Sequence, residues 1–193
     1  MKDFQLWFQI GMEHILDFAG YDHICYIAAL AIMYHFKTWK PLLIQVTAFT
    51  IGHSLCLAAS VFDVIKAPQN IIEVIIPITI IITCAINIFN IFQNQAFAKK
   101  ANYAMALLFG LVHGLGFSYL LKAMLGKEES IVSPLFAFNI GLELGQIAIL
   151  LIVLSFTFLV EKSKLINPKH WIQVASATIF IVALHLLFER FSV

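Results

Sequence analysis

Residues 70–92, NIIEVIIPITIIITCAINIFNIF, carry one charged side chain, Glu73, in a run long enough to cross a lipid bilayer as a helix. Apolar runs of similar length occur before and after it, separated by short polar or charged stretches. Because lipid offers no partner to an unpaired backbone group, such runs predict membrane-spanning helices. We therefore expect an all-α, polytopic membrane bundle of about six transmembrane helices, at residues 22–37, 41–62, 70–92, 101–122, 133–160 and 170–190.

The composition of the chain excludes an ordinary soluble domain. Its 193 residues are 61% hydrophobic and 12% charged, whereas soluble domains carry roughly 45–50% apolar and about 25% charged residues. The connecting segments are too short to fold alone, so we expect residues 1–193 to form a single integral membrane domain.

The net charge of +1 argues against a nucleic-acid partner, which would require a basic patch. The three cysteines form no CxxC pair, which argues against a disulfide framework or a thiolate zinc site.

Basic residues in the connecting segments predict the orientation of the chain, since cytoplasmic loops carry an excess of Lys and Arg. Seven lysines fall on one side of the expected bundle, and five basic residues, each close to an acidic residue, fall on the other. The first group comprises Lys37, Lys40, Lys99, Lys100, Lys162, Lys164 and Lys169, and the second comprises Lys2, Lys66, Lys122, Lys127 and Arg190. This bias predicts that both termini lie on the outer side of the membrane.

The first expected span is short. Its residues 22–36 would cover about 22 Å of a hydrocarbon core about 30 Å thick, at about 1.5 Å per residue. The preceding residues 4–18 are amphipathic and carry three ionisable side chains, one of them His14, which makes them too polar for an independent span. We expect an N-terminal amphipathic or re-entrant helix in the outer leaflet that breaks at Gly20, with Asp22 capping the helix that follows.

Ionisable side chains in these runs converge at one depth. Such groups are costly in a membrane, so each is a functional hypothesis. His53 and His113 both lie about 18 Å from the cytoplasmic edge, at about 1.5 Å per residue, and Glu143 reaches a similar depth from the other side. The candidates come from at least four helices and form a layer in the outer half of the bilayer: His14, Asp22, His23, His53, Glu73, His113, Glu143 and His185.

Helical spacing indicates that the faces around this layer are interior. Polar or small residues recur at intervals of three or four, which places them on one face of each helix. Glycines on such a face let a neighbouring backbone approach closely. The polar stripes are Thr47, Thr50 and Ser54, and Asn139, Glu143 and Gln146; Gly141 and Gly145 form a small-residue face on the other side of the latter helix, and Gly110, Gly114 and Gly116 flank His113. A further polar run, Thr83, Asn87, Asn90 and Asn94, offers a route to the cytoplasm.

The donors in this layer are imidazoles and carboxylates without thiolates, a set that suits Ni²⁺, Co²⁺, Zn²⁺ or Fe²⁺. A divalent cation would also neutralise carboxylates that are otherwise unpaired in a low dielectric. We therefore predict a divalent transition-metal site. Its predicted ligands are His14, Asp22, His23, His53, His113 and Glu143.

Several candidates also have a simpler interpretation, whereas a carboxylate at the depth of Glu143 must be protonated, paired or bound to a metal. Asp22 could act only as a helix cap, and His53 or His113 could serve only as an interhelical hydrogen-bonding group, as polar residues in membranes often do. Glu73 could lie solvated at the interface, and His185 could line the same cavity or merely brace the bundle. The positions of the side chains in space decide between these interpretations.

Four blocks of the sequence resemble the signature blocks of the HupE/UreJ family of hydrogenase and urease accessory membrane proteins. The blocks are residues 11–23 (GMEHILDFAGYDH), 47–54 (TAFTIGHS), 109–117 (FGLVHGLGF) and 138–146 (FNIGLELGQ). The resemblance implies a bacterial inner-membrane protein that acts as a secondary permease for nickel or cobalt and supplies the maturation of metalloenzymes. Maturation proteins, or further copies of this chain, would then be its partners. A protein that only binds the metal and docks to such partners is a further alternative.

Two functions would use the same side chains differently. In a transporter the metal ion is the substrate, which is captured from the outer side and released inward by a rocking of the bundle. In a membrane-embedded zinc-dependent hydrolase the metal keeps an open position, and its bound water attacks a carbonyl group. The chain lacks an HExxH motif, so we expect transport rather than catalysis. A polar path that continues to the cytoplasmic side would favour transport, and a cavity open to one face would favour the hydrolase.

Overall fold

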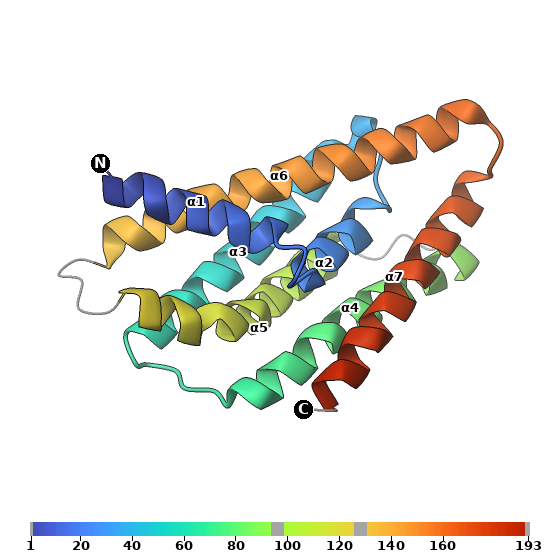
Figure 1. Ribbon diagram of the computed structural model, residues 1–193. Helices are drawn as coiled ribbons and strands as arrows, with labels where there is room; N and C mark the ends of the chain where they lie inside the picture. The colour runs from blue at the N-terminus through green and yellow to red at the C-terminus, as the bar shows by residue number, and fades with distance from the viewer. Residues whose placement is uncertain (1, 94–98, 126–130, 192–193) are drawn as a thin grey trace.

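The computed structural model describes residues 2–93, 99–125 and 131–191, and these residues form helices and no strand (Figure 1). The predicted all-α bundle is therefore confirmed. The helices are α1 (Lys2–Leu16), α2 (Asp22–Ala31), the 3₁₀ helix η1 (Phe36–Thr38), α3 (Trp39–Val61), α4 (Gln69–Gln93), α5 (Lys99–Leu125), α6 (Val132–Ser163) and α7 (Pro168–Phe191).

Five of these helices, α3 to α7, have the length and apolar composition to cross a membrane. The mean hydropathy of their most apolar stretches lies between 1.7 and 2.4. In α7 only 17% of that stretch is buried inside the bundle, so most of an apolar helix faces outward, where lipid would cover it. These helices begin within a few residues of the predicted starts.

The predicted first span, residues 22–37, is longer than the helix that the structure contains. α2 begins at Asp22, as expected, but ends at Ala31 after ten residues, which is too few to cross a bilayer. The chain then turns, and the Tyr34 hydroxyl donates a hydrogen bond to Gln45 Oε1 of α3 at 2.9 Å. A capping box starts η1 just before α3. These contacts end α2 within an apolar run, so hydropathy alone could not locate its end.

α1 and α2 together follow one path across the bundle. α1 runs beside α6 in the same direction, because Phe8 lies against Gly141 and Met12 lies against Gly145 (Figure 1). After a break at residues 17–21, α2 continues beside α4 and α6. At about 1.5 Å per residue, the two helices together reach roughly 37 Å, which is enough for one crossing. α1 is thus the predicted N-terminal helix, and we interpret α1 and α2 together as one discontinuous span.

The start of α1 and the end of α7 lie at the same end of the bundle, since successive crossings alternate in direction (Figure 1). At that end Arg190 of α7 lies 3.4 Å from Glu73 of α4, and Lys122 of α5 forms an ion pair with Asp63 at 2.6 Å. This arrangement agrees with the prediction that both termini share one side of the membrane. Which side it is stays a prediction, and Lys127, one of the residues behind it, lies outside the described residues.

Two pairs of helices that run in parallel, α3 with α5 and α1 with α6, pack backbone against backbone. A Cβ atom added at Gly110 would overlap the carbonyl oxygen of Phe49, and one at Gly114 would overlap that of His53. The small-residue face of α6 meets α1 in the same way. Such faces let helices approach more closely than larger side chains would allow. The close approach of α3 and α5 places His53 and His113 at the centre of the bundle.

Candidate metal site

Four of the predicted ligands, all histidines, come together at the break between α1 and α2. His14 lies near the end of α1 and His23 near the start of α2, whereas His53 and His113 come from the middle of α3 and α5. Their ring centroids are 4.6 Å apart for His14 and His23, 4.9 Å for His23 and His113, and 5.6 Å for His14 and His53. Three of them are buried, with His23 at 5% exposed and His53 and His113 at 0%. We call these four residues the histidine cluster.

The break in the discontinuous span is what brings His14 and His23 together. In one continuous helix these two residues would lie about 13 Å apart along the axis. Instead, the Ala19 N–H donates to Asp17 Oδ1 at 2.8 Å and helps to turn the chain. Asp22 is the first residue of α2 and not its cap, because the residue before it occupies the cap position. The predicted capping role of Asp22 is therefore wrong by one position.

Ring nitrogens of the histidine cluster lack hydrogen-bond partners. Within the described part of the chain, five of them are buried and unpaired: His14 Nε2, His23 Nε2, both ring nitrogens of His53, and His113 Nδ1. Buried polar atoms in proteins are hydrogen-bonded in the large majority of cases, so five unpaired nitrogens in one place call for a ligand. Among the described residues nothing supports the interpretation that His53 only links helices through a hydrogen bond, because neither of its ring nitrogens has a partner there.

Three members of the histidine cluster are placed to share one ion. His14, His23 and His53 each offer a ring nitrogen, and the three nitrogens lie within 4.8 Å of one another. Nitrogen ligands stand about 2.1 Å from Zn²⁺, so two ligands of the same ion are at most about 4.2 Å apart. A small inward movement of the rings would therefore complete a three-nitrogen site. His113, beside His23, is the candidate for a fourth ligand.

Asp22 contacts the histidine cluster through His23. Its Oδ1 accepts the backbone N–H of His23 and lies 2.7 Å from His23 Nδ1. A neutral imidazole carries one N–H, and with that proton on Nδ1 the lone pair of Nε2 is free. Carboxylates in this position orient metal-binding histidines and raise their basicity. Asp22 thus orients His23, and its predicted role as a direct ligand stays a prediction.

Glu143 lies between α3 and α6, in a ladder of side-chain hydrogen bonds that joins the two helices. The predicted polar stripes of α3 and α6 face each other here, as interior faces should. Glu143 has its charge next to a hydroxyl donor rather than among the three nitrogens that are placed to share an ion, and its predicted role as a ligand stays a prediction. The three pairs are Thr47 Oγ1 with Glu143 Oε1 at 2.9 Å, Thr50 Oγ1 with Gln146 Oε1 at 2.7 Å, and Ser54 Oγ with Asn139 Oδ1.

A cavity of about 210 Å³ connects the histidine cluster to the end of the bundle where α4 begins and α7 ends. Its acidic lining residues are Asp17, Asp22 and Glu73. At its mouth Glu73 Oε2 lies 3.4 Å from Arg190 Nη1, and both side chains are partly exposed. Acidic walls raise the local concentration of cations. Glu73 is therefore neither isolated nor part of the cluster, but belongs to the mouth of the cavity.

On the other side of the histidine cluster, a column of buried polar side chains follows one face of α4. Thr79 lies beside His113, and Thr83, Asn87 and Asn90 follow at helical spacing toward the opposite end of the bundle. All four are buried, with exposed fractions from 3% to 8%. Asn94, the predicted last member of this run, lies outside the described residues. The polar surface thus continues from the cluster toward the far end of α4.

The model of one protein family, described as HupE / UreJ protein, matches residues 1–190. The chain belongs to the HupE/UreJ family. This family is associated with nickel or cobalt uptake or with an accessory function, and the histidine cluster provides donors that suit such ions. Searches among curated proteins and solved structures find no match to this chain.

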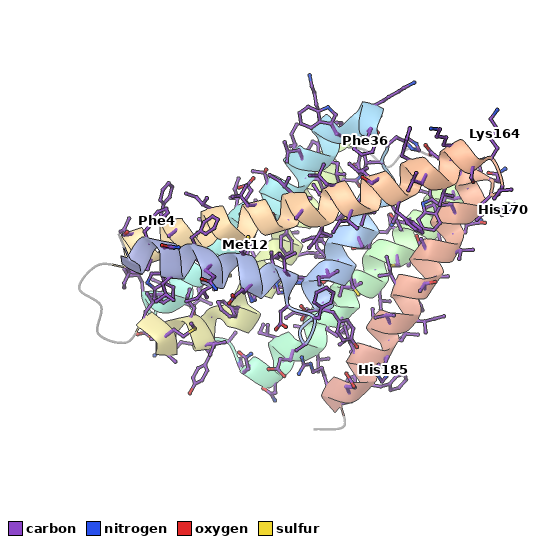
Figure 2. The ribbon with its side chains drawn as sticks, turned by 45° about the horizontal axis from the view of Figure 1, so that its top comes forward. Phe4, Met12, Phe36, Lys164, His170 and His185 are labelled. Carbon is purple, nitrogen blue, oxygen red and sulfur yellow. The ribbon has the colours of Figure 1, made fainter. Side chains whose placement is uncertain are left out.

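In this HupE/UreJ chain, the interpretation of one residue from the sequence was wrong, and one residue of the site was not predicted. His185 is exposed on α7, where its Nε2 lies 3.3 Å from Glu189, so it neither lines the cavity nor braces the interior (Figure 2). Thr79, which contacts His113, was not among the candidates. Its position four residues before Thr83, on the same face of α4, is the signal that could have found it.

Proposed function

We propose that this chain is a secondary transporter of a divalent transition metal, with nickel or cobalt as the principal substrate and zinc as a further candidate. The observation that carries the proposal is the set of unpaired imidazole nitrogens buried at the break of a discontinuous span. Neutral imidazole binds nickel, cobalt and zinc. Secondary transporters often bind their substrates near the midplane, where broken helices expose the backbone and side chains.

The surroundings of the histidine cluster favour transport over hydrolysis. The acidic cavity gives a cation access from the end where both termini lie, and the α4 column offers polar groups toward the opposite end. An enzyme needs access from one side only, whereas a transporter needs a route on both. A rocking of the α1–α6 pair against the α3–α5 pair would open these routes in turn, with the cluster between them.

The charge balance of the site also supports a divalent cation. Four neutral imidazoles would replace the water ligands of the ion without adding charge. The carboxylate of Asp22 contacts one of these imidazoles, that of His23. Glu143 of α6 supplies a second negative charge near the centre of the bundle, where it contacts Thr47 of α3. A 2+ ion would therefore meet about as much negative charge as it carries, which limits the cost of placing it in a low dielectric.

We further propose a bacterial inner membrane as the location, with both termini in the periplasm and the lipid bilayer around α3 to α7. The cytoplasmic loops then carry the larger group of lysines, in keeping with the positive-inside rule. Metalloenzyme-maturation proteins would receive the ion on the cytoplasmic side, and further copies of the chain are possible partners within the membrane. Nucleic acid is not expected as a partner of a chain with a net charge of +1.

Uptake into proteoliposomes tests the proposal. Purified protein is reconstituted, and Ni²⁺ or Co²⁺ entry is measured by radioactive counting, with His53→Ala as the test variant and His185→Ala as the matched control. We expect uptake above that of empty liposomes for the wild type and the control, and background uptake for His53→Ala. Equal uptake by wild type and His53→Ala would overturn the proposal. Zn²⁺-dependent hydrolysis of a lipid or peptide by the same preparation, without uptake, would favour the hydrolase instead.

A further inference from the structure

We infer that Thr79 of α4 is a positioning residue of the metal site, which holds His113 in the tautomer whose Nδ1 lone pair is free to bind the ion. His113 thereby becomes the fourth nitrogen ligand beside His14, His23 and His53. This inference rests on the proposed function, because it concerns how the same site binds its substrate. It assigns a role to a residue that does not itself contact the ion.

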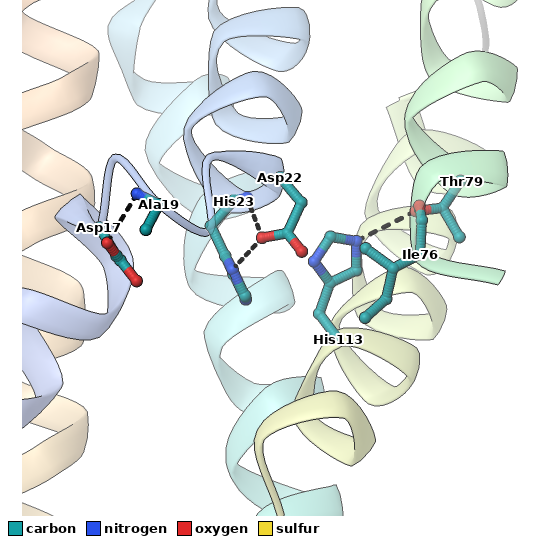
Figure 3. A network of polar contacts seen from close by, with 7 residues as sticks. All are labelled: Asp17, Ala19, Asp22, His23, Ile76, Thr79 and His113. Atoms are coloured by element: carbon teal, nitrogen blue, oxygen red, sulfur yellow. Dashed lines mark hydrogen bonds and ion pairs between the residues drawn. The ribbon is translucent and has the colours of Figure 1, made fainter. Parts of the chain in front are cut away.

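The hydrogen bonds around Thr79 determine where its proton lies. Thr79 Oγ1 lies 2.7 Å from the carbonyl oxygen of Ile76 and 3.0 Å from His113 Nε2 (Figure 3). A hydroxyl group has one proton to donate, and a carbonyl oxygen can only accept. The proton of Thr79 therefore goes to Ile76, and Thr79 Oγ1 is left to accept a hydrogen bond from His113.

This arrangement selects one tautomer of His113. To donate to Thr79, the ring must carry its proton on Nε2, and a neutral imidazole has only one N–H. Nδ1 is then the nitrogen with the free lone pair. Nδ1 is buried and has no hydrogen-bond partner, so nothing in the described part of the protein occupies that lone pair.

His23 is also held by an oxygen atom on one of its ring nitrogens, that of Asp22. Asp22 lies 2.7 Å from its Nδ1 and leaves its Nε2 unpaired. The rings of His23 and His113 are 4.9 Å apart, and Figure 3 shows Asp22 between them, bonded to His23, with Thr79 on the far side of His113. Two neighbouring histidines on two different helices thus both keep a lone pair for the same ligand.

An oxygen acceptor on the remote N–H of a metal-binding histidine fixes the ring orientation and makes the ligand more basic, and its removal typically weakens metal binding about 10- to 100-fold. The Thr79→Val variant keeps the shape of the side chain but has no hydroxyl group. His113 could then take either tautomer, and its Nδ1 would no longer be reserved for the ion. We therefore expect the variant to lose the His113 ligand while keeping the other three.

The experiment measures binding and coordination rather than transport. Co²⁺ is titrated into purified protein in nanodiscs to obtain the affinity, and the X-ray absorption spectrum of bound Co²⁺ gives the number of imidazole ligands. We expect four imidazoles for the wild type, and three with an affinity about 10- to 100-fold lower for Thr79→Val. Thr79→Ser, which restores the hydroxyl, should recover both values. Thr178→Val is the matched control, because Thr178 also bonds the backbone of its own helix but lies exposed on α7.

The possible outcomes separate this inference from the proposed function. Unchanged affinity and ligand number in Thr79→Val, or equal losses in Thr79→Val and Thr79→Ser, would overturn the role of Thr79 while leaving a metal-binding transporter. A wild-type protein that binds no Co²⁺ would overturn the proposed function, and this inference with it. If Thr79→Val does not fold, ¹⁵N chemical shifts of histidine-labelled wild type decide the question. We expect the Nε2–H tautomer for metal-free His113, and the Nδ1–H tautomer would overturn the inference.

Discussion

His53 is fully buried, and neither of its ring nitrogens has a hydrogen-bond partner in the part of the chain that the structure describes. Leaving a buried polar group unpaired costs about 1–3 kcal/mol relative to a satisfied one. Phe138 stacks on one side of the ring, with the ring centroids 6.4 Å apart, and offers no polar group in compensation. The metal-free protein is therefore expected to be less stable than it would be with an apolar residue at this position, because the site is suited to binding a cation. Functional sites commonly lower stability in this way.

Replacing His53 by leucine is expected to stabilise the metal-free protein and to abolish its stabilisation by metal. Leucine fills a similar volume without polar atoms, so the free energy of unfolding should rise by about 1 kcal/mol. The wild type should gain about 2.7 kcal/mol from Ni²⁺ at 100 times its Kd, and His53→Leu should gain nothing. Thermal unfolding in detergent, with and without Ni²⁺, measures both effects. A leucine variant that Ni²⁺ stabilises as much as the wild type would contradict the role of His53.

At the scale of helices, Gly110 and Gly20 have different physical roles. At Gly110 the backbone of α3 comes so close that a Cβ atom would overlap the carbonyl oxygen of Phe49. Gly20, in the break between α1 and α2, is different, because a Cβ atom there would meet only the Asp17 carboxylate at an ordinary 3.4 Å. Close packing therefore requires glycine at the α3–α5 crossing, whereas the break does not depend on a glycine.

We expect Gly110→Ala to destabilise the protein and Gly20→Ala to leave its stability nearly unchanged. In Gly110→Ala the new methyl group must push α3 and α5 apart, which should lower the free energy of unfolding by about 1–3 kcal/mol, as overpacking does in well-packed cores. Thermal unfolding of the two variants and the wild type, all without metal, provides the measurement. Equal stability of Gly110→Ala and wild type would mean that the two helices are not held at this distance.

At the scale of the whole molecule, the discontinuous span determines the topology. If α1 and α2 together count as one crossing, α3 to α7 bring the number of crossings to an even number. The two termini then lie at the same end of the bundle (Figure 1). If α1 instead lay flat on the surface, the short α2 could not reach across a bilayer alone. The acidic cavity opens at the end that carries the termini, and Lys162, Lys164 and Lys169, in or beside the connection between α6 and α7, lie at the other.

Labelling of single cysteines in intact cells is expected to reveal this orientation. Lys66→Cys, in the exposed connection between α3 and α4, should react with a membrane-impermeant maleimide added outside. Lys162→Cys, at the end of α6, should react only after the membrane is permeabilised, because lysine-rich loops remain in the cytoplasm. A protein without its native cysteines serves as the background. The reverse labelling pattern would place the termini and the acidic cavity on the cytoplasmic side.

Several features of the site could be predicted from residues alone, and others could not. His14, His23, His53 and His113 were predicted to lie at one depth, and the structure brings their rings together. The depth of a residue follows from its place within an apolar run, which is a local property. The direction in which a side chain points relative to a distant helix is not local, so the hydrogen bond that Glu143 accepts from the Thr47 hydroxyl was not predicted, and its role as a ligand stays a prediction.

The sequence by itself determined the helical class of the protein, the approximate ends of five long helices and the layer in which its histidines lie. Hydropathy and helical period suffice for these features, because lipid forces the backbone of any long apolar run into a helix. Only the tertiary structure decided that α2 ends at Ala31, that Thr79 contacts His113, and that Glu143 pairs with a residue 96 positions away. Each of these depends on contacts between separate segments, which form only when the helices pack and which no local pattern encodes.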